Sequence, residues 1–124
     1  SAIEELVGSK DFEAVLLGQE VDRDPDRYSL WHSTQKNYPG LNITSYVDPR
    51  ADRALEEGRK VTDRGKRKTH YLHFQQLFLE DNPAIFLYHP NLNYFVSRKF
   101  SGIDLSPVFI PADRFWNIRE WKKL

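Results

Sequence analysis

The chain lacks cysteine and methionine altogether in its 124 residues. Without cysteine, disulfide bonds, thiolate zinc sites and cysteine nucleophiles are excluded. The missing methionine leads us to expect a processed product or a fragment of a longer protein. No apolar run approaches the length that a membrane-spanning helix needs.

An excess of charge is also absent, because 18 Lys and Arg residues balance 18 Asp and Glu residues. A nucleic-acid groove needs clustered positive charge, so the balance argues against nucleic acid as a partner. The sequence contains no nucleophile elbow, phosphate-binding glycine loop or metalloprotease motif. His70 and His73 stand three residues apart but have no third ligand at useful spacing. We therefore predict no enzyme activity, no metal site and no cofactor.

The most informative segment spans residues 11–26. Its apolar run, residues 14–17, is typical of a strand buried on both faces. The run stops at Gly18, and four carboxylates follow at alternate positions, Glu20, Asp22, Asp24 and Asp26. Open α/β sheets place ligands at such strand ends. A strand followed by a solvated acidic loop has the same pattern, so both interpretations stay open.

Two helices are predicted in the middle of the chain. Asp48-Pro49 combines an N-cap carboxylate with proline at the first helical position, which predicts a helix over 48–61. A second helix is predicted over 66–81 and ends at Asn82-Pro83, because proline disfavours helix at the residue before it. The inward-facing residues are Ala51, Ala54, Leu55, Gly58 and Val61 on the first helix and Tyr71, Phe74, Leu77 and Phe78 on the second.

The remaining elements are shorter. Strands are predicted over 12–18, 84–89 and 93–98, a short extended piece over 102–105, and a strand or turn over 115–121. Residues 2–7 are typical of a helix end, and 25–35 of a short helix or turn. The prediction is an α/β fold in which the strands 12–18 and 84–89 share one sheet and both long helices pack on it.

Six motifs in order carry a family resemblance: DFEAVLLG, DPDRYSLWHSTQ, GLNITSY, DPRADRALEEGRKV, RKTHYLHFQQLFLEDNPAIFLYHP and NYFVSRKFSGI. Together they resemble the C-terminal quarter of the extracellular solute-binding proteins of family 5, the dipeptide and oligopeptide receptors of bacterial ABC importers. The resemblance implies the C-terminal part of a type II periplasmic-binding-protein fold, in which two lobes close around a ligand. Residues 1–90 would belong to the second lobe, and residues 91–124 would return to the first.

The resemblance also implies a function. The parent protein would capture a peptide or another small solute outside the membrane, extracellularly or in the periplasm, and deliver it to ABC permease subunits. Its own attachment to the membrane would be through a lipid anchor or the permease. Two alternatives stay open: an oligosaccharide-binding member of the family, or a free-standing α/β interaction module with an aromatic protein-binding surface.

Members of the family that resemble the peptide receptors carry a tryptophan one residue after the strand-ending glycine and an aspartate three residues beyond it. That aspartate pairs with the free amine of a bound peptide, and its position here is Asp22. The tryptophan position is Gln19, and an amide cannot supply the apolar platform of an indole, so the ligand type stays open.

Other residues complete the predicted site. Glu20 can share a face with Asp22 as the chain leaves the strand. Tyr88 and His89 would lie where the chain leaves the second lobe, and Trp31 is a further ligand-binding candidate. Packing in the second lobe is the alternative for Trp31 and its neighbour His32. A structural role in the loop before residue 48 is predicted for two more residues, Asn42 and Tyr46.

One prediction concerns the isolated chain. Several aromatic residues of the 91–124 segment would lose their cover if it evolved to rest on an absent lobe: Tyr94, Phe95, Phe100, Phe109, Phe115, Trp116 and Trp121. Exposed apolar patches of this size favour association. We expect a homodimer or a tail folded back on its own sheet, with the homodimer favoured.

Overall fold

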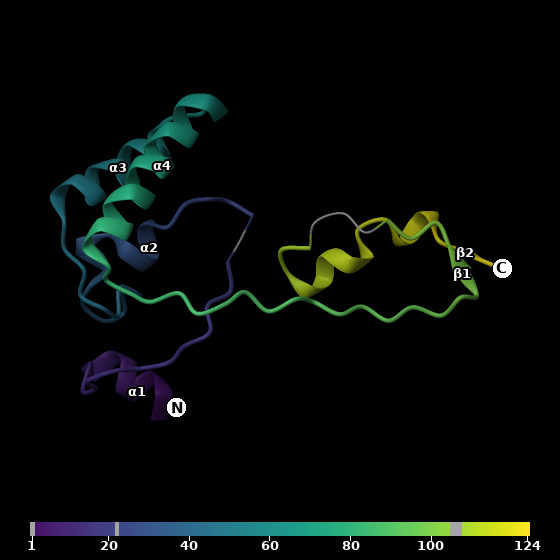
Figure 1. Ribbon diagram of the computed structural model, residues 1–124, viewed down its shortest axis with the longest axis horizontal. Helices are drawn as coiled ribbons and strands as arrows, with labels where there is room; N and C mark the ends of the chain where they lie inside the picture. The colour runs from purple at the N-terminus through teal and green to yellow at the C-terminus, as the bar shows by residue number, and fades with distance from the viewer. Residues whose placement is uncertain (1, 22, 105–107) are drawn as a thin grey trace. The chain divides into compact units, whose positions relative to one another are not determined.

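Helices dominate the computed structural model, which describes residues 2–21, 23–104 and 108–124, with the backbone alone for residues 2–4 and 6 (Figure 1). The chain divides into two compact units. The first contains Ser1–Leu16 and Pro25–Phe86, and the second contains Leu17–Asp24 and Leu87–Leu124. None of the described helices is long and apolar enough to cross a membrane.

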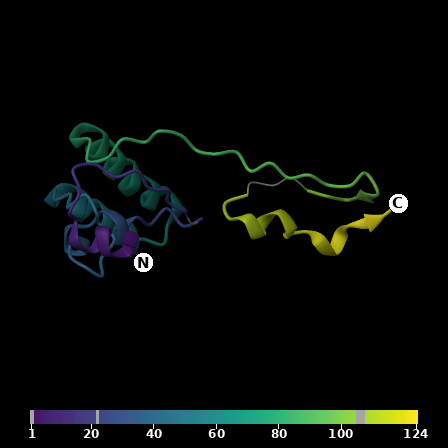
Figure 2. The same cartoon turned by 90° about the horizontal axis from the view of Figure 1, so that it is seen from below.

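The first unit is built from four α-helices. They are α1 (Ala2–Ser9), α2 (Tyr28–Trp31), α3 (Pro49–Lys60) and α4 (Arg64–Asp81), with a 3-10 helix at Ser33–Gln35 between α2 and α3. The long helices α3 and α4 pack against each other, and they lie side by side in both views (Figures 1 and 2). Both predicted helices are thereby confirmed, as are the short helices near residues 2–7 and 25–35.

Local capping explains where α3 and α4 begin and where α4 ends. Asp48 accepts a hydrogen bond from the Arg50 backbone N–H at 2.7 Å, next to a proline at the first helical position. Asp63 caps α4 in the same way, through the N–H of Lys66. At the far end Asn82 adopts a left-handed conformation, which terminates the helix just before Pro83. Each of these signals lies within a few residues of the boundary that it sets.

The core of the first unit lies between α2, α3 and α4. Gly58 lets α3 approach α4 closely, because a Cβ atom there would lie 2.9 Å from Cζ of Tyr71. The ring of Phe78 meets that of Trp31 edge-on, with centroids 4.5 Å apart. The predicted inward residues of α4 are all buried; on the first helix Val61 alone is half-buried, and it lies just past the helix end. The core is Trp31, Tyr46, Ala51, Ala54, Leu55, Tyr71, Phe74, Leu77 and Phe78.

The strand predictions are wrong for most of the chain. Among the described residues, the paired strands are β1 (Phe100–Ser101) and β2 (Lys122–Lys123), which are antiparallel with Phe100 opposite Lys123. Segments 12–18, 84–89 and 93–98 form no strand, so the predicted common sheet is not present. A strand exists only through hydrogen bonds to a neighbouring strand, and nothing in the described chain pairs with these segments. Their apolar side chains are correspondingly exposed, 80% for Leu16 and 83% for Ile85.

The second unit contains β1, β2 and two 3-10 helices, Pro111–Phe115 and Ile118–Glu120. The extended piece predicted over 102–105 is replaced by the strand at 100–101, although residue 105 itself lies outside the described residues. Gly102 has a φ of 79°, and a Cβ there would lie 2.6 Å from the Glu120 carbonyl oxygen, so this turn requires glycine. Four rings contact one another in this unit, those of Tyr94, Phe100, Phe115 and Trp121.

Candidate functional site

The predicted ligand-binding residues lie mainly on two stretches without regular secondary structure. Gln19 and Glu20 are exposed and belong to the 17–24 stretch of the second unit. Tyr88 and His89 are also exposed and belong to the same unit, where the chain continues from residue 87; Tyr88 is 80% exposed. Asp22 lies outside the described residues. The structure thus gives both stretches side chains that are free to meet a ligand.

Trp31 is placed differently from the other candidates. It lies in α2 and is buried in the core of the first unit against Phe78. This position agrees with the alternative role of Trp31 in packing, because helix α4 covers its ring and shields it from solvent. A direct ligand contact through Trp31 stays an untested prediction.

His32 anchors a polar cluster beside that core. Its Nε2 lies 3.2 Å from Oε1 of Glu56 on α3, and its Nδ1 lies 2.9 Å from Oγ1 of Thr34. Asp52 of α3 accepts hydrogen bonds from the backbone N–H and the hydroxyl of Ser33, at 2.8 and 2.5 Å. These bonds attach the 3-10 helix to α3. The imidazole is buried and its ring nitrogens are engaged, which indicates a structural role.

Asn42 and Tyr46 hold the loop before α3, and the structure confirms the structural role predicted for them. The amide of Asn42 is fully buried; it donates to the Tyr46 carbonyl oxygen at 2.8 Å and accepts from the Tyr46 N–H at 3.1 Å. The Tyr46 hydroxyl donates to Oδ2 of Asp81 at 2.7 Å. Burial and this bond raise the pKa of the Tyr46 phenol above its usual value. The loop is therefore fixed at both ends.

Asp48 has the most strongly shifted carboxyl pKa of the first unit. The Arg50 guanidinium donates to both of its oxygens, from Nε to Oδ1 at 3.2 Å and from Nη2 to Oδ2 at 2.7 Å. This contact, opposed by burial, lowers the pKa of Asp48 to about 2. The carboxylate is already committed to capping α3. It is accordingly a structural group and not a candidate acid or base.

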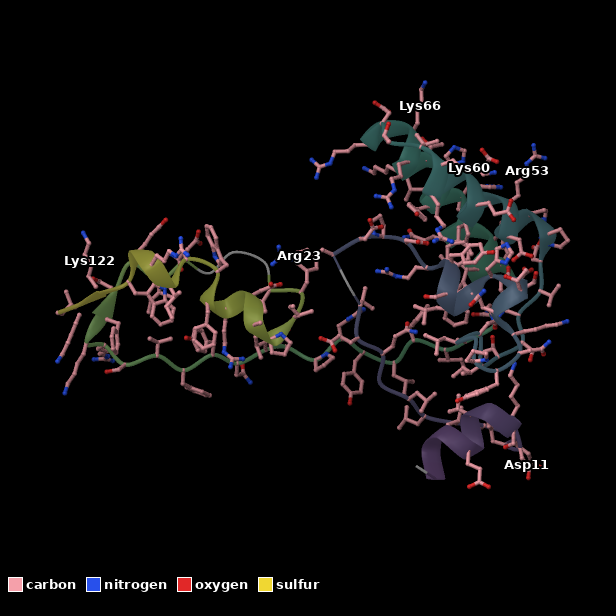
Figure 3. All side chains as sticks on the ribbon, turned by 180° about the vertical axis from the view of Figure 1, so that it is seen from behind. Asp11, Arg23, Arg53, Lys60, Lys66 and Lys122 are labelled. Atoms are coloured by element: carbon pink, nitrogen blue, oxygen red, sulfur yellow. The ribbon has the colours of Figure 1, made fainter. Side chains whose placement is uncertain are left out.

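One ion pair in the second unit joins residues 90 positions apart, and sequence reasoning did not find it. Arg23, labelled in Figure 3, contacts the carboxylate of Asp113. Asp113 also accepts hydrogen bonds from the backbone N–H groups of Phe109 and Ile110, which lower its pKa. The pair ties the predicted acidic stretch to the C-terminal part of the chain. No short-range pattern marks such a contact.

The described residues contain neither a metal-ligand cluster nor an unsatisfied buried polar side chain. No group of three or more His, Asp or Glu side chains among them could hold a metal ion. Every buried side-chain nitrogen or oxygen of the described chain has a hydrogen-bond partner.

Comparison with known proteins finds relatives that match most of this chain. The oligopeptide-binding protein AppA of Bacillus subtilis (strain 168) is 30% identical over 111 residues, which cover 90% of this chain and 20% of AppA. Protein XP55 of Streptomyces lividans is 32% identical over 87 residues, 70% of this chain and 16% of XP55. The structure of AppA in complex with a nonapeptide superimposes with a TM-score of 0.73 at 28% identity, over 99% of this chain and 24% of AppA. The chain is homologous to AppA over most of its own length.

A second solved relative agrees with this result. NikZ from Campylobacter jejuni, in complex with Ni(L-His), superimposes with a TM-score of 0.59 at 26% identity, over 86% of this chain and 22% of NikZ. No family model matches the chain. Both solved relatives are type II periplasmic-binding proteins, and the helix-and-strand content here is consistent with a part of that fold. The chain spans about a fifth of the length of the curated relatives that it matches.

Proposed function

We propose that the chain is a segment of an ABC-importer substrate-binding protein that captures peptide-like solutes outside the cytoplasmic membrane and delivers them to a permease. The superposition on the peptide complex of AppA over 99% of this chain carries the proposal. No covalent chemistry is needed. The work of the protein would be closure of two lobes around the solute, driven by contacts that form only in the closed state.

The division of the chain supports the lobe assignment. The chain passes between its two units at residues 16–17, 24–25 and 86–87, and both of the irregular stretches lie next to these passages. Hinges in two-lobed binding proteins are a few residues that absorb backbone rotation where the chain passes between lobes. We assign residues 1–90 to the second lobe and residues 91–124 to the first lobe; within the second-lobe portion, residues 17–24 group with the C-terminal residues in the structure.

The ligand site would combine the acidic stretch with the exposed Tyr88 and His89. In this proposal Asp22 pairs with the free amine of a peptide, Glu20 adds negative charge beside it, and Gln19 stands where a flat apolar ring would otherwise stack. A ring such as Tyr88, exposed on an irregular segment, is well suited to cover the apolar part of a solute.

Calorimetric titration of the full-length protein tests the proposal. N-acetylation of a peptide removes the amine, so we expect the free peptide to bind roughly 10- to 100-fold more tightly, the range for a hydrogen bond to a charged group. Asp22→Asn should abolish that preference. Glu13→Gln, at an exposed carboxylate before the apolar run, is the matched control and should keep it.

The same titration separates the alternatives. Oligosaccharides that give heat where peptides give none would assign the family's sugar-binding function, and Ni²⁺ with L-histidine tests the ligand of NikZ. An unchanged preference for the free amine in Asp22→Asn would remove the proposed pairing. Absence of heat with every solute would favour the protein-interaction module.

A further inference from the structure

Positive charge is concentrated where α3 passes into α4. Residues 59–68 contain six Lys and Arg residues and a single acidic residue, Asp63, a local net charge of +5 in a chain whose formal net charge is zero. Figure 3 shows the labelled side chains of Arg53, Lys60 and Lys66 projecting from this helical pair. The balance of the whole chain therefore conceals a basic surface on the first unit.

Half of these six cations have no described carboxylate within ion-pair distance. Arg59 pairs with Asp26 and Lys60 with Glu57, both at 3.0 Å. Three of them, Arg64, Lys66 and Lys68, are exposed, and no described carboxylate lies within ion-pair distance of them. The same is true of Arg53, which precedes this segment on α3. With Arg67 these four residues form what we call the α3–α4 basic surface.

Helix stability does not explain this arrangement. The N-terminus of a helix carries partial positive charge and favours acidic side chains in its first turn. The first turn of α4 has no acidic residue and contains Arg64, Lys66 and Arg67 instead. The Nε of Arg67 donates a hydrogen bond to the Gly58 carbonyl oxygen at 3.1 Å. The N-cap carboxylate of Asp63 is the acidic group at this end of α4, and it is outnumbered by the three cations. The surplus of positive charge suits a negatively charged partner outside the chain.

The same surface contains a shallow hollow of about 440 Å³. Its cationic lining comes from Arg64, Arg67 and Lys68, and its apolar lining includes Leu72, which is half-exposed, and Tyr71, which is buried. Cations beside exposed apolar surface suit a partner that is anionic and amphiphilic.

We propose that the α3–α4 basic surface binds the anionic phosphate headgroups of a membrane surface. Clusters of four to eight Lys and Arg residues bind anionic lipid surfaces, each contributing through a diffuse field. Exposed, unpaired lysines with no fixed geometry suit a diffuse anionic surface better than they suit the fixed carboxylates of one protein partner. The surface would hold the protein near the membrane independently of solute binding, since it uses none of the residues proposed to contact the solute.

Co-sedimentation of the 124-residue chain with lipid vesicles tests this proposal. Vesicles of equimolar phosphatidylcholine and phosphatidylglycerol should bind the chain, vesicles of phosphatidylcholine alone should not, and added salt should release it. The double variant Lys66→Gln, Lys68→Gln should bind roughly 30-fold more weakly, about fivefold for each charge removed. Lys122→Gln, Lys123→Gln removes the same charge from exposed lysines of β2 and should change binding less than about threefold.

Three results would overturn the proposal. Equal binding to neutral vesicles would assign the contact to apolar surface. An equal loss in the β2 variant would show that net charge alone matters. Binding of the wild-type chain to polyglutamate but not to anionic vesicles would assign the surface to an acidic protein.

Discussion

Replacing Asn42 by alanine removes the group that fixes the loop before α3. In the native chain its amide bonds to both backbone groups of Tyr46, and it donates more weakly to the carbonyl oxygens of His32 and Trp31 at 3.2 and 3.4 Å. The Thr44 hydroxyl donates to it from the solvent side at 3.3 Å. One fully buried side chain therefore serves several backbone groups that have few other partners.

The expected cost follows from which groups lose their only bond. The His32 carbonyl oxygen keeps a hydrogen bond from the N–H of Gln35 at 2.9 Å. The N–H and carbonyl of Tyr46 have no other bond recorded among the described residues. A buried polar group left without a partner costs about 1–3 kcal/mol, so two of them cost about 2–6 kcal/mol. We expect Asn42→Ala to lower the free energy of unfolding by about 4 kcal/mol.

Urea unfolding followed by far-UV circular dichroism measures this change, because α3 and α4 give most of the helical signal. Asn37→Ala is the matched control: Asn37 is exposed in the same unit, and its loss should change stability by less than about 0.5 kcal/mol. A loss below about 1 kcal/mol for Asn42→Ala, at an unchanged slope with urea, would refute the reasoning. It would mean that water or a shifted backbone satisfies the Tyr46 groups.

Three further predictions use the same assay or light scattering. The pKa of Asp48 lies at about 2 instead of 3.8. The stability that its carboxylate contributes is therefore present above pH 3.8 and is lost as the pH falls to about 2. The wild-type chain should exceed Asp48→Asn in free energy of unfolding by about 1 kcal/mol after solvent screening, and this difference should vanish across that window. Gly58→Ala drives a Cβ into the Tyr71 ring and should destabilise by about 1–3 kcal/mol, whereas Gly65→Ala meets only a side-chain oxygen at 3.4 Å and should be neutral or stabilising. The exposed apolar side chains of residues 85–88 should make the isolated chain associate, as a homodimer in the simplest case, and a dilute monomer that binds no apolar dye would contradict this.

The elements that could be predicted from the sequence are those whose causes are local. Asp48-Pro49 and Asn82-Pro83 set helix boundaries through contacts within a few residues, and the spacing of Tyr71 and Phe74 defines a buried face. The strand predictions were wrong because the stability of a strand depends on partners distant in the chain. The run ending at Leu17 has strand-like composition, but no described segment pairs with it.

In the candidate site, too, local contacts could be predicted and distant ones could not. The structural role of Asn42 could be predicted from its place in the loop just before the helix start at Asp48. The ion pair of Arg23 with Asp113 could not, since it joins distant positions without a pattern. Net charge describes only the whole chain: the total is zero, while residues 59–68 carry a charge of +5. Charge has to be assessed locally before partners are excluded.

The two proposed surfaces rest on different kinds of structure, which makes them separable by experiment. The α3–α4 basic surface lies on two capped helices that share a buried core, so its geometry is set within the first unit. The solute residues lie on irregular stretches whose apolar side chains are exposed, so their geometry depends on further surface that covers them. Solute affinity should therefore be weak in the isolated chain and restored in the full-length protein, whereas vesicle binding should be the same in both. A chain that binds peptides fully on its own would show that these stretches need no further cover.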